Sequence, residues 1–156
     1  MLRNLLIIFI LPFFSAAQIK IDRAGDFWEV KTQMALDKIK SVDSAYHDII
    51  VNSCDNISFW NGSFSTNSDG GVNTKGTIII SKRDVEYDDI DNVCAVLVHE
   101  AFHLMLRMKG QKMSENEEEL ICYRAELDYL LKVPGVGIYL INHAKNQILR
   151  RVPIKD

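Results

Sequence analysis

The chain has 156 residues, about the length of one folded domain. Hydrophobic residues make up 47% of it and charged residues 25%, which excludes a disordered chain and a collagen-like repeat. The formal net charge of −3 leaves no basic excess to neutralise phosphates, so we expect no nucleic-acid partner. Three cysteines are too few for a scaffold held together by disulfides.

The first 17 residues have the composition of a secretory signal peptide. Arg3 is their single charged residue, the apolar run Leu5–Phe14 follows it, and Ser15–Ala17 offers the small side chains of a cleavage site. A membrane-spanning helix needs about 20 apolar residues, so this run is too short for a transmembrane anchor. We therefore expect cleavage after Ala17, a secreted or periplasmic protein without a stable membrane anchor, and a single domain over residues 18–156.

Export would permit a disulfide bond. Cys54, Cys94 and Cys122 allow one bridge and leave one thiol over, and the sequence does not choose the pair. Three buried, unpaired thiols are an equally good interpretation, because free cysteine is among the most buried residue types. None of the three lies in a recognisable context for a catalytic nucleophile.

The first half of the mature chain predicts one long helix and then strands. Residues 24–48 fit a helix whose buried face has apolar residues three or four positions apart, namely Phe27, Val30, Met34, Ile39, Val42 and Tyr46. Strands are expected at Ile49–Cys54 and Ile57–Phe64. Residues 61–76 are rich in Gly, Ser, Asn and Thr, which favours a turn or loop and is compatible with a hairpin.

The second half predicts a strand and three helices, so the fold class is α+β. The expected elements are a strand at Thr77–Ser81, a charged connector over 82–91, and helices over 91–109, 115–132 and 137–150. Gly110 marks the end of the first of these helices. Ser114 and Glu117 have the spacing of a capping box, which opens the second.

The sequence His99-Glu100-Ala101-Phe102-His103 carries the chemistry. Residues four apart on a helix project from one face, so the two imidazoles can reach the same metal ion. Glu100, one step around the helix, can act as the general base toward a zinc-activated water that attacks a carbonyl. The alternative is an ordinary buried helix, which would have to bury two histidines and a glutamate without purpose.

This stretch resembles the zincin metallopeptidases. Their wider pattern asks for uncharged or apolar residues around the motif, and this chain supplies Val96, Leu97, Ala101, Phe102, Leu104 and Met105. The resemblance implies a zincin-like α+β fold, one bound Zn²⁺ and a peptide or protein substrate. It implies that His99 and His103 are metal ligands.

A catalytic zinc needs a third protein ligand and one open position. The metzincin type is excluded, because Lys109 stands where that group has its third histidine. Gluzincins use a glutamate from the following helix, and Glu119 to Tyr123 resembles their Glu-x-x-Ala-Tyr stretch with Cys122 in place of Ala. The resemblance makes Glu119 the expected third ligand, with Glu118 and then Glu126 as alternatives.

Helical phase sorts these glutamates further. Glu119 and Glu126 share a face that leans inward, whereas Glu117 and Glu118 lean outward. Tyr123 occupies the position where larger gluzincins have an aspartate that orients a ligand histidine, so another residue must do this. The candidates for that role are Glu126 and Asp128, and the candidates for stabilising an oxyanion are Tyr123, Tyr139 and His143.

The zincin resemblance also suggests that the strand at Thr77–Ser81 lies at a sheet edge and pairs with an extended peptide. A buried central strand is the alternative, which the run Ile78–Ile80 favours. The sequence thus indicates a small secreted zinc metallopeptidase of gluzincin type. The other possibilities are a catalytically inactive zincin-like protein that binds zinc, and an interaction domain without metal.

Overall fold

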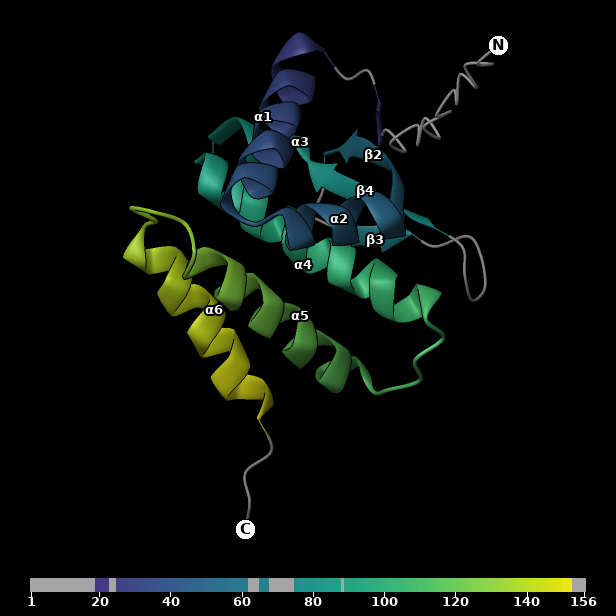
Figure 1. Ribbon diagram of the computed structural model, residues 1–156, viewed down its shortest axis with the longest axis vertical. Helices are drawn as coiled ribbons and strands as arrows, with labels where there is room; N and C mark the ends of the chain where they lie inside the picture. The colour runs from purple at the N-terminus through teal and green to yellow at the C-terminus, as the bar shows by residue number, and fades with distance from the viewer. Residues whose placement is uncertain (1–18, 23–24, 62–64, 68–74, 88, 153–156) are drawn as a thin grey trace, which may run out of the picture.

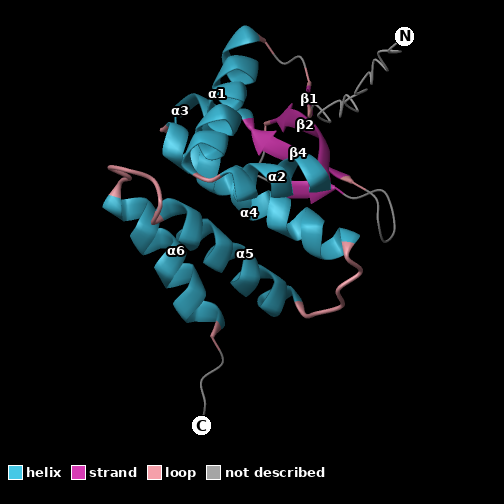
Figure 2. Ribbon diagram, viewed as in Figure 1, coloured by secondary structure: helices cyan, strands magenta, loops and turns pink. Residues whose placement is uncertain are grey.

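Helix α4 (Ile90–Met108) runs between two groups of elements in the computed structural model, which describes residues 19–22, 25–61, 65–67, 75–87 and 89–152. A small sheet with α1 (Asp26–Val42) and α2 (Ser44–Ser53) lies on one side, and α5 (Glu115–Leu130) with α6 (Ile138–Arg151) on the other (Figure 1). Figure 2 shows this mixture of helices and a small sheet, in agreement with the α+β class. The predicted signal peptide lies outside the described residues. Within those residues, every helix is too short or too polar to cross a bilayer.

The single helix expected over 24–48 is two helices, and the strand expected at Ile49–Cys54 is wrong. Asp43 has an extended backbone after α1, and its carboxylate accepts a hydrogen bond from the Ala45 amide as the cap of α2. The β-branched run that suggested a strand continues this helix. Its buried residues Tyr46, Ile50 and Ser53 have helical spacing.

The predicted buried face of the first helix is wrong over most of α1. Phe27, Val30 and Met34 are 54%, 56% and 57% exposed. Ile39, which was also predicted on that face, is buried. The other buried residues of α1 are Thr32, Ala35 and Leu36. The inward stripe of α1 thus contains Ala35, Leu36 and Ile39, which belong to the main core.

The described strands form one sheet in the order β1-β2-β4-β3. Its strands are β1 (Lys20–Ile21), β2 (Cys54–Trp60), β3 (Ser65–Asn67) and β4 (Gly76–Ser81). β4 confirms the strand predicted at Thr77–Ser81, and β3 makes an antiparallel hairpin with it. Because β2 pairs in parallel with its other edge, β4 is central. The expectation that a peptide pairs with this strand is therefore wrong.

The ends of the later helices follow the sequence signals. The charged connector contains the short helix α3 (Lys82–Tyr87). Gly110 has a φ of 64°, and it closes α4 while the next amide bonds back to Leu106. Ser114 and Glu117 form the predicted capping box at the start of α5. These two ends fix the turn that folds α5 back along α4.

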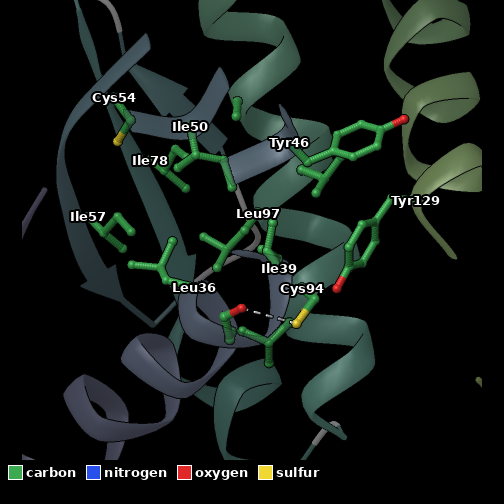
Figure 3. Packing of buried hydrophobic residues seen from close by; sticks show 14 of the residues in the cluster. Leu36, Ile39, Tyr46, Ile50, Cys54, Ile57, Ile78, Cys94, Leu97 and Tyr129 are labelled. Atoms are coloured by element: carbon green, nitrogen blue, oxygen red, sulfur yellow. Dashed lines mark hydrogen bonds between the residues drawn. The ribbon is translucent and has the colours of Figure 1, made fainter. Parts of the chain in front are cut away.

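One apolar core joins the sheet, α1, α2 and the inner side of α4. Figure 3 shows Leu97 among Ile39, Ile50 and Ile78, which come from three other elements. Cys54, Cys94 and Cys122 are all buried and free, so the interpretation as unpaired thiols is confirmed. Burial raises the pKa of Cys54 to about 11 and that of Cys94 to about 12, which leaves both thiols protonated at neutral pH.

Candidate metal centre

Two antiparallel helices build the candidate site. His99 faces Glu126, and His103, one turn further along α4, faces Glu118 near the start of α5. Both imidazoles are buried, and the closing turn after Gly110 sets the register between the helices. The site is thus formed by side chains on rigid elements, which holds them in a defined geometry.

The Nε2 atoms of the two histidines point at each other and at Glu119. They are 3.2 Å apart. One carboxylate oxygen of Glu119 lies 3.3 Å from Nε2 of His103, and the other lies 3.8 Å from Nε2 of His99. The three residues expected as metal ligands therefore meet at one point.

The opposite ring nitrogens contact two other carboxylates. Nδ1 of His99 lies 3.0 Å from Glu126, and Nδ1 of His103 lies 2.7 Å from Glu118. Glu118 also forms an ion pair with Arg107, with 3.3 Å between the nitrogen and the oxygen. Both histidines thus have the carboxylate partner that is typical of metal-binding imidazoles.

This arrangement suits a metal-binding tautomer. In a neutral imidazole whose Nδ1 donates to a carboxylate, Nε2 is the acceptor nitrogen. Two acceptor nitrogens and a carboxylate that converge are a donor set for a metal ion. Two nitrogens of one tetrahedral zinc site lie about 3.3 Å apart, close to the separation found here. The residues therefore fit a zinc ion.

Cys122 lies beneath the same point. Its sulfur and the ligand nitrogens of His99 and His103 all lie within 4.8 Å of one another. The side chain is fully buried, and burial raises the pKa of its thiol above the usual range. Two histidines and a thiolate are also a zinc ligand set, so Cys122 is a second candidate for the third ligand.

Glu100 borders the pocket that opens beside His99. The pocket has a volume of about 330 Å³ and is lined by Asn92, Val96, His99, Glu100, Glu119, Tyr123, Glu126 and His143. Burial raises the pKa of Glu100, while the two neighbouring imidazoles oppose that rise when they are charged. Glu100 therefore adjoins the same space as the candidate ligands and has a carboxyl group suited to accepting a proton.

The structure separates the remaining predicted site residues. Tyr123 and His143 line the pocket, and the Tyr123 ring lies 4.4 Å from that of His99. Tyr139 instead donates to Asp89 at the start of α4 and is absent from the pocket lining. Asp128 accepts from Tyr46, and no contact between it and a histidine is found in the described part of the chain. Of the two candidates for orienting a histidine, Glu126 is the one that contacts His99 there.

Two contacts at the candidate site were not predicted from the sequence. Glu118 was expected to lean outward, yet it reaches His103 because α5 faces α4 with a broad stripe that includes residues 118, 119, 122, 123 and 126. Arg151, at the end of α6, contacts Glu119. The spacing of the stripe could have revealed Glu118, but nothing local in the sequence points to Arg151.

Comparison of the chain with protein-family models, with curated proteins and with solved structures finds no match.

Proposed function

We propose that this protein is a small, secreted zinc-dependent metallopeptidase of the gluzincin type with a zincin-like fold. One observation carries the proposal. Nε2 of His99, Nε2 of His103 and the Glu119 carboxylate converge, while both Nδ1 atoms are held by carboxylates. Peptides and proteins are the proposed substrates, and nucleic acids are not.

In this proposal, His99, His103 and Glu119 would hold a zinc ion, which would supply polarisation of a carbonyl and an acidic water near neutral pH. Glu100 takes a proton from that water as its oxygen bonds to the carbonyl carbon. The carbon–nitrogen bond then breaks, and Glu100 delivers the proton to the leaving amine. Glu118 and Glu126 hold the imidazoles in the tautomer that leaves Nε2 open.

Replacement of Glu100 by Gln tests the proposal. We expect Glu100→Gln to keep its zinc and to lose about 10²–10⁴-fold in the rate of peptide hydrolysis, because the amide cannot accept a proton. Zinc content by elemental analysis and cleavage of a peptide library measure the two effects. Glu86→Gln, an exposed change of the same charge on α3, is the control and should behave as the parent.

Two outcomes would contradict the proposal. A purified parent protein that binds no zinc removes the metal centre. A Glu100→Gln variant as active as the parent removes the assigned general base.

The place of Cys122 favours a second candidate, a zinc-binding protein without catalysis. If both Cys122 and Glu119 bound the ion, four protein ligands would close the site, as in structural zinc centres. The cobalt-substituted protein distinguishes the two, because a thiolate ligand adds a strong near-ultraviolet charge-transfer band that a carboxylate does not. A parent protein that shows this band and hydrolyses no peptide supports the second candidate.

A further inference from the structure

The last helix contacts the Glu119 carboxylate through Arg151. Arg151 lies in the final turn of α6, and its guanidinium nitrogen is 3.4 Å from an oxygen of Glu119. That oxygen is also the one 3.8 Å from His99, whereas the other oxygen lies 3.3 Å from His103. Arg151 therefore contacts the carboxylate on the oxygen that is further from the histidine pair.

Arg151 is held in this position by its own neighbours. Its other terminal nitrogen donates to the side-chain oxygen of Gln147 at 2.7 Å and to the backbone oxygen of the same residue at 3.1 Å. The guanidinium also lies over the Tyr123 ring, 4.6 Å from its centre. Asn116 on α5 donates to the backbone oxygen of Arg151. The contact to Glu119 is thus made by a fixed group and not by a swinging surface side chain.

We propose that Arg151 is a positioning residue that orients the Glu119 carboxylate toward the metal ion, an inference that rests on the proposed metal centre. A carboxylate on a helix has free rotation about its side-chain bonds, and a bond to one oxygen fixes the direction of the other. Hydrogen bonds of this kind to ligating carboxylates determine how well a site is formed before the ion enters. The last helix, which supplies no ligand, thereby contributes to metal affinity.

The direction of the change in zinc affinity distinguishes a positioning role of Arg151 from a purely electrostatic role. A positive charge beside a cation site repels the ion, so removal of Arg151 would tighten zinc binding if charge alone mattered. Loss of orientation has the opposite effect and weakens binding. Arg150, the adjacent residue, is exposed and carries the same charge, and no contact to Glu119 is found for it among the described residues.

The experiment compares zinc affinity, measured by chelator competition, in the parent, Arg151→Gln, Arg151→Lys and Arg150→Gln. We expect Arg151→Gln to bind zinc roughly 10–100-fold more weakly. Arg150→Gln should bind as the parent does or slightly more tightly. Arg151→Lys keeps the charge but loses the planar fork, so it should fall between the parent and the glutamine variant. The visible spectrum of the cobalt-loaded protein should change in Arg151→Gln and should stay as in the parent in Arg150→Gln.

A variant that lacks the Glu119 carboxylate tests whether Arg151 acts through this group. In a Glu119→Ala protein, Arg151→Gln should cause no further loss of zinc affinity, because the carboxylate that it orients is gone. Equal affinities in Arg151→Gln and Arg150→Gln, or tighter binding in Arg151→Gln, would overturn the inference while leaving the metal centre intact. A parent protein without zinc would overturn the proposed function itself. If Arg151→Gln does not fold, the zinc affinity of Arg151→Lys tests the inference instead. Parental zinc affinity in Arg151→Lys would then overturn it.

Discussion

The two sides of α4 bury different chemistry. Toward the sheet, α1 and α2, the helix presents apolar residues such as Val93, Leu97 and Leu104, all within the main core. Toward α5 it presents His99 and His103, which are equally buried but contact carboxylates. Apolar contacts continue on this side too, where Ala95 packs with Leu130 of α5. The polar cluster is thus set among apolar contacts between α4 and α5.

The difference separates stability from function. Burial of apolar surface stabilises the fold by about 25 cal/mol per Å². Burial of ionisable groups removes their hydration, and their mutual contacts offset this cost only in part. The apolar contacts therefore contribute most of the stability, and the polar cluster could hold a metal ion. Changes on the two sides should then have separable consequences.

The largest expected effect comes from the apolar side. Leu97→Ala should lower the free energy of unfolding by about 2–5 kcal/mol, because it removes a fully buried side chain and leaves a cavity. Urea denaturation of the metal-free protein measures this loss. Since Leu97 is two residues from His99, and about 200° around the helix, zinc affinity of the folded variant should stay close to that of the parent. A loss of zinc affinity as large as that in a site variant would show that the two sides are not separate.

On the polar side we expect a smaller effect, a loss of zinc affinity with little change in stability. Glu126→Gln should weaken zinc binding by roughly 10–100-fold, because the imidazole of His99 loses its charged partner. Stability of the metal-free protein should change little, since the glutamine oxygen can still accept a hydrogen bond from Nδ1 of His99. Chelator competition and urea denaturation measure the two quantities.

Glu118→Gln provides the matched comparison for this prediction. Glu118 is more exposed than Glu126 and already interacts with Arg107, so the loss of zinc affinity should be smaller. Parental zinc affinity in Glu126→Gln would show that the carboxylate does not support a ligand.

The same division explains how much the sequence could predict. The histidine pair lies within one helical turn, so its geometry follows from local spacing, and the capping residues around Gly110 and Ser114 placed α5 against it. The prediction that Glu119 lies near these histidines needed only helical phase and a family resemblance. Each of these signals is local in the chain.

Predictions that depend on tertiary packing were less successful. Both stripes of α1 carry apolar residues, and its packing against α4, α2 and α3 decides that Ala35 and Leu36 are buried while Phe27 is exposed. The cap at Asp43 outweighed the strand propensity of Ile49 and the residues after it. Arg151 and Glu119 are far apart in sequence, so their contact has no local signal.

The smallest effect lies away from both sides of α4, where α5 ends against the junction of α1 and α2. Lys132 forms ion pairs of 2.9 Å with Asp43 and 2.7 Å with Asp128, and these lower the pKa of both carboxyl groups and raise that of the lysine. Because the groups are partly exposed, Lys132→Met should lower stability at pH 7 by less than about 1 kcal/mol. Lys145→Met on α6 is the control, since no ion pair of Lys145 is found in the described part of the chain.

The pH dependence of this difference follows from the directions of the pKa shifts. A carboxyl group with a lowered pKa stabilises the fold above its unfolded pKa of about 3.9, and this contribution is lost as the pH falls through the folded pKa. A lysine with a raised pKa stabilises below its unfolded pKa of about 10.4, and that contribution is lost as the pH rises through the folded pKa. The gap between the parent and Lys132→Met in urea denaturation should therefore be constant from about pH 5 to pH 9 and shrink in stronger acid. A gap that stays constant into stronger acid would show that the lysine stabilises through its contact with the Tyr46 ring and not through its ion pairs.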